Sequence, residues 1–180
     1  MTNLDIKDRN LDIGLVFLRI LVGASAIYHG SQKLFGAFGG PGISKFTDMM
    51  GGNWRVPDLM ATLLVLGEFF GGVAILLGLL TQVAAAGFLS VMVGAWLTKL
   101  GMASSYNFGD LETEWLLVLG SSALIFTGAG AFAADAFLPW RGRLRKFAPY
   151  LFVGSLVVIT LIWLIFNKTN PLDAPKMTMG

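Results

Sequence analysis

LMATLLVLGEFFGGVAILLGLL at residues 59–80 and VAAAGFLSVMVGAWLT at residues 83–98 are two long apolar runs separated only by Thr81 and Gln82. Each run is close to the length of helix, about 20 residues, that crosses roughly 30 Å of hydrocarbon in a bilayer. The connection between them is so short that the two helices must be antiparallel neighbours. The stretch therefore predicts a transmembrane helical hairpin.

Three more apolar segments of similar length occur outside this hairpin, at residues 11–35, 114–134 and 148–166. Hydrophobic residues make up 55% of the 180-residue chain and charged residues 13%, with a mean hydropathy of +0.71. A soluble domain of this size exposes too many of its residues to water to hide that much apolar surface. We expect an all-α polytopic membrane protein with five spans and with membrane lipids as its surroundings.

The chain has no cysteine and one histidine, His29. These counts exclude a disulfide, a thiolate-bound metal, and a histidine-rich metal or haem site made by this chain alone, so we expect no metal. The net charge is +2, and the basic residues concentrate at residues 141–146. Such a cluster next to apolar spans fits a membrane surface better than a nucleic-acid partner.

The same basic cluster predicts the orientation of the chain. Short loops rich in lysine and arginine stay in the cytoplasm, which places the loop between the fourth and fifth spans inside. Counting spans outward puts the N-terminus in the cytoplasm, the loops at 36–57 and 99–113 outside, and the C-terminus outside.

The first outer loop is predicted to contain a short helix. Ile43, Phe46 and Met50 recur at helical spacing within residues 43–50, which indicates an amphipathic helix lying on the membrane surface. The glycines before it do not form a phosphate-binding loop, because no strand precedes them and no Gly-Lys-Ser/Thr follows. Small residues such as those of Gly67-x-x-x-Gly71 are assigned to packing between helices of the same chain.

Two opposite charges, Arg19 and Glu68, fall near the middle of the first and second predicted spans. A lone charge at the bilayer centre costs about 2.5 kcal/mol or more, so each needs a partner. We expect Arg19 and Glu68 to form a buried ion pair, directly or through water.

A second polar group is predicted towards the outer side. Lys33 lies close to four helical turns after Arg19, His29 lies one turn from Lys33, and Glu114 begins the fourth span. Either these charges fix the helix register and lie at the interface, or His29, Lys33 and Glu114 form a site for a quinone head group or for proton transfer. Asp135 is expected to pair with the basic cluster at 141–146 and not to be a catalytic acid.

A set of short motifs, in this order, resembles the DoxX family over about residues 12–138. The stretches that carry the resemblance are Arg19, His29-Gly30, Lys33-Leu34-Phe35-Gly36, residues 39–42, Glu68-Phe69-Phe70-Gly71-Gly72, residues 77–81, Glu114-Trp115-Leu116-Leu117, Gly128-Ala129-Gly130 and Asp135. The resemblance implies a DoxX-like four-helix membrane bundle over residues 1–138. Residues 139–180 then add the cytoplasmic basic loop, one extra transmembrane helix at 148–166 and a polar tail. The sequence departs from the family pattern at Gln82, where an arginine is common, and at Thr98-Lys99, where a histidine often stands.

The resemblance also implies a function. It is to membrane subunits associated with thiosulfate:quinone oxidoreductases and to membrane partners in oxidative-stress complexes, in the bacterial inner membrane. We therefore expect a subunit or accessory of a membrane oxidoreductase complex that contributes to a quinone site and has other protein subunits as partners. The alternative is a non-catalytic membrane scaffold or assembly protein. A small-solute transporter is a third class, which the lack of an inverted repeat or broken helix in the sequence disfavours.

Overall fold

The computed structural model describes residues 3–54, 56–102, 111–140 and 143–166 of the chain. These residues form helices and no strand, so the predicted all-α fold is confirmed. The α-helices are α1 (Asn3–Phe35), α2 (Gly42–Trp54), α3 (Asp58–Leu77), α4 (Thr81–Met102), α5 (Glu112–Thr127) and α6 (Ala148–Phe166), with short 3-10 helices η1 (Ala37–Gly39), η3 (Ala134–Phe137) and η4 (Leu144–Phe147). The predicted polar tail at 167–180 and the start of the basic cluster at 141–142 lie outside the described residues.

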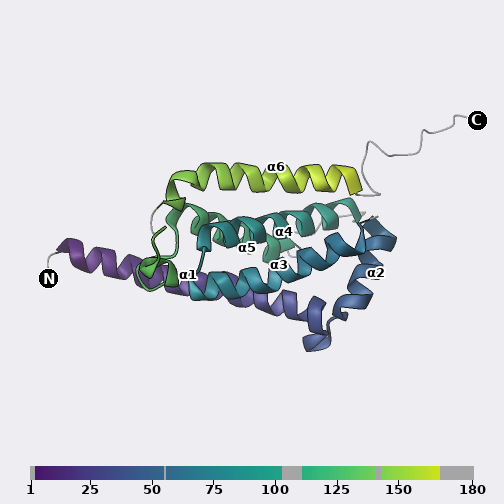
Figure 1. Cartoon of the computed structure of the whole chain (residues 1–180), viewed down its shortest axis with the longest axis horizontal. Helices are drawn as coiled ribbons and strands as arrows, with labels where there is room; N and C mark the ends of the chain where they lie inside the picture. The colour runs from purple at the N-terminus through teal and green to yellow at the C-terminus, as the bar shows by residue number, and fades with distance from the viewer. Residues whose placement is uncertain (1–2, 55, 103–110, 141–142, 167–180) are drawn as a thin grey trace, which may run out of the picture.

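The helices pack as two antiparallel pairs with one added helix. α1 lies along α3, α4 lies between α3 and α5, and α6 packs on α4 (Figure 1). Helix α2 lies across one end of the bundle, and the first turns of α1 extend beyond the other end. We call the end covered by α2 the α2 end, and the opposite end, which holds the α3–α4 connection at residues 78–80, the turn end.

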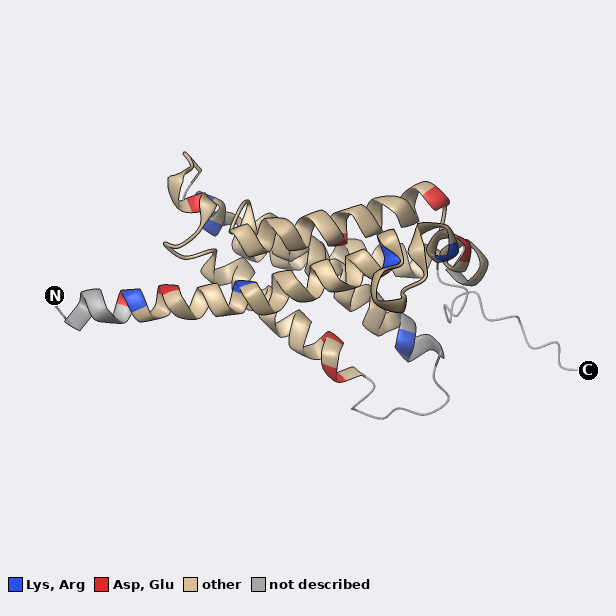
Figure 2. Cartoon of the chain, turned by 90° about the horizontal axis from the view of Figure 1, so that it is seen from below, with Lys and Arg blue, Asp and Glu red and all other residues tan. Residues whose placement is uncertain are grey.

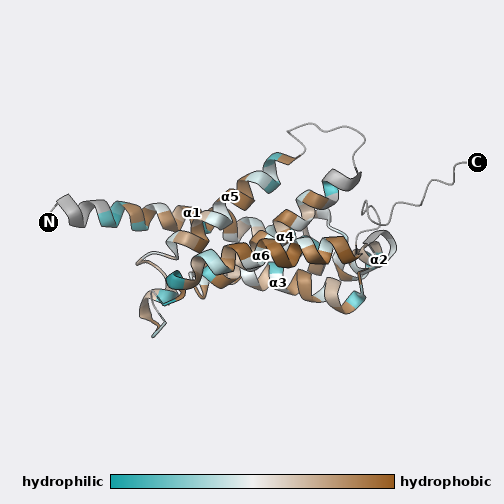
Figure 3. Cartoon of the chain, turned by 90° about the horizontal axis from the view of Figure 1, so that it is seen from above, coloured by the Kyte–Doolittle hydropathy of each residue, from teal (hydrophilic) through white to brown (hydrophobic). Residues whose placement is uncertain are grey.

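The lengths and composition of these helices suit a membrane. Asp8–Phe35, Asp58–Leu77 and Leu144–Phe166 are long and apolar enough to cross a bilayer, and Thr81–Leu97 is a shorter apolar helix. Their outward sides are covered by large apolar residues, and polar residues gather towards the ends (Figure 3). Such an exterior is stable where lipid and not water is the solvent.

The predicted helix boundaries hold for α6, which coincides with the predicted segment 148–166. The fourth predicted span was expected to run to residue 134, but α5 ends at Thr127. This boundary was wrong because Gly128 and Gly130 adopt positive φ values of 76° and 81°, a conformation in which helices end. At 16 residues, α5 is about 24 Å long.

The short helix expected at residues 43–50 lies within α2, which extends to Trp54. Its side chain Phe46 is only 8% exposed and packs in a cluster with Val56, Ala61 and Val65. Phe46 therefore faces the bundle and not a lipid surface. Helix α2 therefore packs against α3 and covers this end of the bundle.

Glycines allow α1 and α3 to approach until their backbones touch. A Cβ atom added at Gly30 would lie 2.8 Å from the backbone of Phe69, and one at Gly72 would lie 2.8 Å from Ala26 and Ile27. A Cβ atom at Gly67 or Gly71 would meet nothing within 4 Å. The prediction that Gly67 and Gly71 serve packing within the chain was therefore wrong, because their side of α3 faces outward.

We predict that Gly30→Ala lowers the free energy of unfolding by about 1–3 kcal/mol, because the new methyl group must push the α1 and α3 backbones apart. Gly71→Ala is the matched control in the same helix pair, and its effect should stay below about 0.5 kcal/mol. Titration of the purified protein with a denaturing detergent in mixed micelles would measure both values. Equal effects of the two substitutions would contradict the packing described above.

Candidate functional site

Charged positions are few along the helices of the bundle, and some of them lie within its central part (Figure 2). At the α2 end, the Lys33 ammonium donates to both carboxylate oxygens of Glu68, at 2.8 and 2.6 Å. The Glu68 side chain is fully buried and that of Lys33 is 24% exposed. The ammonium also lies 5.6 Å from the ring centre of Phe46 on α2. Helix α2 thus covers an ion pair that joins α1 to α3.

A second ion pair joins α4 to α5 at the same end. Lys99 Nζ lies 2.6 Å from Glu114 Oε1, with side-chain exposures of 48% and 11%. Lys99, like Lys33, belongs to the last turn of its helix, and Glu114 belongs to the first turn of α5. A carboxylate near a helix N-terminus and an ammonium near a C-terminus both interact favourably with the helix dipoles.

The predicted pair of Arg19 with Glu68 was wrong. Arg19 is 3% exposed, but its Nη2 donates to the carbonyl of Phe132 at the turn end. Its guanidinium fills the space beside Gly78, where an added Cβ atom would collide with it. Gly78 is ten residues after Glu68, or about 15 Å along α3. The antiparallel register set by the glycines therefore separates Arg19 from Glu68 and brings Lys33 to it.

Asp135 holds the start of α4 in place. Its carboxylate accepts hydrogen bonds from the backbone amides of Leu80 and Thr81, at 2.8 and 3.0 Å, and from Trp140 Nε1 at 3.1 Å. These bonds satisfy amides at a helix N-terminus that have no partner within the helix. Asp135 also lines a cavity of about 410 Å³ together with Arg145. Its direct bonds join the α3–α4 connection, the start of α4 and Trp140, so its role is structural.

The structure does not bring His29, Lys33 and Glu114 together as one cluster. Lys33 is bound by Glu68, and Glu114 by Lys99. His29 is half-buried, its ring centre lies 5.4 Å from that of Tyr28, and within the described part of the chain its side chain makes no hydrogen bond. The described residues contain no cluster of three or more metal-binding side chains.

His29 and Glu114 nevertheless lie at the same level of the bundle. α1 and α5 touch where an added Cβ atom at Gly120 would lie 2.8 Å from Val22. Six residues from Gly120 to Glu114 and seven from Val22 to His29 correspond to about 9 and 10 Å towards the α2 end. Seven residues are close to two turns, so His29 lies on the same side of α1 as Val22.

Two buried polar atoms near Glu114 are left without a hydrogen-bond partner among the described residues. They are Glu114 Oε2 and Trp96 Nε1. The Trp96 ring lies 4.9 Å, centre to centre, from the ring of Trp115, the residue after Glu114. A buried polar group without a partner costs about 1–3 kcal/mol, so these atoms indicate a place for a ligand or a water molecule.

Sequence reasoning missed Lys99 and Trp96 in this site. A signal for Lys99 existed, because it ends one predicted span and Glu114 begins the next at the same membrane side. Trp96 carried no such signal, since a tryptophan near the end of a span is usually an interfacial anchor.

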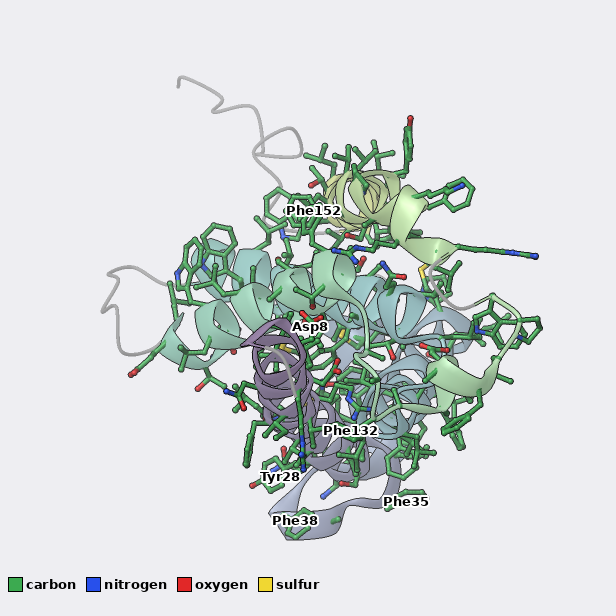
Figure 4. The ribbon with its side chains drawn as sticks, turned by 90° about the vertical axis from the view of Figure 1, so that its left-hand side faces the viewer. Asp8, Tyr28, Phe35, Phe38, Phe132 and Phe152 are labelled. Carbon is green, nitrogen blue, oxygen red and sulfur yellow. The ribbon has the colours of Figure 1, made fainter. Side chains whose placement is uncertain are left out.

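Exposed aromatic side chains form a surface near the α2 end. Tyr28 and Phe38 stack with ring centres 4.9 Å apart, and Figure 4 shows them with Phe35 on the side of the bundle opposite Phe152. Phe38 holds a positive φ of 53° and is 70% exposed. Aromatic residues of this kind are enriched at the membrane–water interface.

Several helices long and apolar enough to span a membrane, with large apolar residues on their exteriors, define an all-α polytopic membrane protein. The model of the DoxX family matches residues 14–100. The Bacillus subtilis (strain 168) protein named "Putative oxidoreductase CatD" is 30% identical over 131 residues, which cover 73% of this chain and 91% of that protein. The Escherichia coli (strain K12) "Inner membrane protein YqjF" is 33% identical over 130 residues, 71% of this chain and 93% of that protein. This chain belongs to the DoxX family. No solved structure matches it significantly.

We predict that Lys33→Met lowers the free energy of unfolding by about 3–5 kcal/mol, because it leaves the Glu68 carboxylate buried without a partner. Glu68→Leu should cost a similar amount for the opposite reason. The double variant should recover much of the loss, since it removes both charges together. Additive losses in the double variant, measured in the same detergent titration, would show that the two residues do not interact.

Proposed function

We propose that this chain is the membrane subunit or accessory of an oxidoreductase complex and that it contributes a quinone site at the α2 end, beside Glu114. The proposal rests on the carboxylate of Glu114, of which only one oxygen has a partner among the described residues. One oxygen is bound by Lys99, and the other is buried with no partner among the described residues. A buried acceptor of this kind suits a ligand that brings a hydrogen-bond donor and exchanges protons.

The residues around Glu114 fit the head group of a quinone. His29 is half-buried, makes no side-chain hydrogen bond within the described residues, and lies on α1 at about the same level along the bundle as Glu114. An imidazole can donate to a quinone carbonyl or pass a proton. The rings of Trp96 and Trp115 provide an apolar wall. Lys33 is no longer a candidate for direct contact, because Glu68 occupies its ammonium.

A bound quinone would supply two-electron redox chemistry, while residues of this chain would hold the head group and move protons. The electrons would come from another subunit of the complex. The name of the Bacillus relative, an oxidoreductase, supports this class of activity, and the name of the Escherichia relative supports a place in the bacterial inner membrane. Aromatic residues at the α2 end would place the site near the membrane interface, where the head group of a lipid-soluble quinone can reach it.

The competing function is a non-catalytic membrane scaffold or assembly protein. The observation that favours it is the Lys33–Glu68 pair, which is closed off by α2 and has no free oxygen on the carboxylate. That pair stabilises the contact of two helices in the register that the glycines set, and it needs no ligand. The two functions differ at Glu114, because a scaffold gains nothing from its unpartnered oxygen.

We predict that Glu114→Gln and His29→Ala each lower quinone-dependent turnover of the intact complex by about 100-fold, the lower end of the range for loss of a proton-exchanging group. Assembly of the complex, followed by native electrophoresis of solubilised membranes, should be unchanged. Asp48→Asn, on the exposed side of α2, is the control and should leave both properties unchanged. Full turnover in both site variants with normal assembly would leave the scaffold function.

The orientation is also a proposal: the turn end faces the cytoplasm and the α2 end faces outward, as the basic residues beside η4 suggest. The chain has no cysteine, so single cysteines can report the two sides. We predict that Phe137→Cys, at a position 88% exposed, reacts with an impermeant maleimide only in inside-out vesicles. Ser44→Cys on α2 should react only in right-side-out vesicles. Reaction of both from the same side would contradict the orientation.

A further inference from the structure

The site beside Glu114 contains one group that can only donate a hydrogen bond and one that can only accept a hydrogen bond. The indole Nε1 of Trp96 can only donate a hydrogen bond, and it is buried without an acceptor among the described residues. The carboxylate of Glu114, bound to the Lys99 ammonium, can only accept through its second oxygen. A ligand that satisfies both atoms must therefore offer an acceptor at one point and a donor at another.

Contacts on both helices bring the two residues Trp96 and Glu114 near each other between α4 and α5. Trp96 and Lys99 are three residues apart on α4, and Lys99 reaches Glu114 on α5. The rings of Trp96 and Trp115 are inclined at 59° with centres 4.9 Å apart, so the indole lies against the residue that follows Glu114. A planar ring next to this tryptophan pair would gain aromatic contacts in addition to its hydrogen bonds.

A quinone and its hydroquinone differ in the group that would meet Glu114. The hydroquinone hydroxyl donates a hydrogen bond to the free carboxylate oxygen, and its other oxygen accepts one from the Trp96 indole. The quinone carbonyl is an acceptor, so it would face another acceptor and leave both without a donor. Sites built to bind a hydroxyl group discriminate strongly against analogues that lack it, because their buried polar groups are then unpaired.

We infer that Trp96 and Glu114 form a site that selects the reduced, hydroquinone form of the ligand over the oxidised quinone. This inference rests on the proposed quinone function and adds the redox form that is bound and the residue that orients it. Trp96 is the positioning donor for either form, because both offer it an acceptor oxygen. Glu114 is the residue that distinguishes them.

The test is to measure the affinities of decylubiquinol and decylubiquinone for the full-length protein in lipid nanodiscs, by anaerobic isothermal titration calorimetry. We expect the hydroquinone to bind more tightly by about tenfold or more. Glu114→Gln should reduce that ratio at least severalfold, because the side-chain amide can donate to a carbonyl. Trp96→Phe should weaken both forms by a similar factor of about 5–10 and leave the ratio unchanged, as expected for one lost hydrogen bond.

Trp163→Phe is the matched control, because Trp163 on α6 also has a buried indole nitrogen without a partner among the described residues. Ser90 bonds to the carbonyl of Ser155 on α6, and Lys99 follows Ser90 by nine residues, or two and a half turns. The α6 contact is therefore on the side of α4 opposite Lys99. This control should leave both affinities and their ratio as in the parent.

The outcomes separate the two proposals. If neither form binds the parent protein, the proposed quinone function fails, and this inference fails with it. If both forms bind with equal affinity, or if Glu114→Gln leaves a clear preference unchanged, the quinone function stands and the selection by Glu114 is wrong. Binding unaffected by Trp96→Phe would likewise overturn the role of Trp96. Detergent stability of each variant, measured in parallel, identifies any loss that comes from unfolding.

Discussion

The close antiparallel contact of α1 with α3 determines where the charged residues of this membrane bundle can meet. Lipid gives helices no hydrophobic reason to associate, so close van der Waals packing between small residues must hold them together. Gly30 and Gly72 let the backbones touch, and a shift by one turn would bring larger side chains into the same positions. With the register fixed, Lys33 lies within reach of Glu68, and Arg19 lies beside Gly78 near the turn end. The pairing of the charges follows from the glycines.

The two Lys–Glu pairs at the α2 end look alike, but they differ in how much of each carboxylate is used. Both oxygens of Glu68 are bound by Lys33, and α2 covers the pair with Phe46. Glu114 is bound through one oxygen, and its lysine is 48% exposed. Breaking a closed buried pair exposes a lone charge to a low-dielectric surrounding, so that pair is suited to hold the helices. The pair whose carboxylate has an unused acceptor oxygen is suited to receive a ligand. We therefore assign ligand binding to α4 and α5, and stabilisation of the bundle to α1 and α3.

Much of the fold could be predicted from the sequence, because the length of an apolar segment is fixed by the thickness of a bilayer. The segment 148–166 coincides with α6 for this reason. The end of α5 was mispredicted, because apolar residues continue past Gly128 while the helical backbone conformation ends before it. For the site, the sequence indicated which charged residues take part but not which of them pair with each other. Depth within a span placed Arg19 beside Glu68, but depth does not reveal register, which depends on which glycines face a neighbouring helix. Of the glycines in α3, Gly72 faces α1 and Gly71 does not, although the Gly67-x-x-x-Gly71 spacing favoured Gly71.

The unpartnered atoms at Trp96 and Glu114 bear on the choice between an oxidoreductase subunit and a scaffold. In a scaffold, the buried indole N–H of Trp96 would gain nothing from being left without an acceptor, and burying it so costs free energy. A carboxylate with one free oxygen has the same drawback in an apolar surrounding. Both costs are recovered if a ligand with one acceptor and one donor occupies the site. A hydroquinone has that pairing, and its hydroxyl proton would point at a carboxylate already balanced by Lys99. That carboxylate could exchange the proton that the ring oxygen gains as electrons arrive from the partner subunit, and the exposed Lys99 beside it opens this position towards the membrane surface.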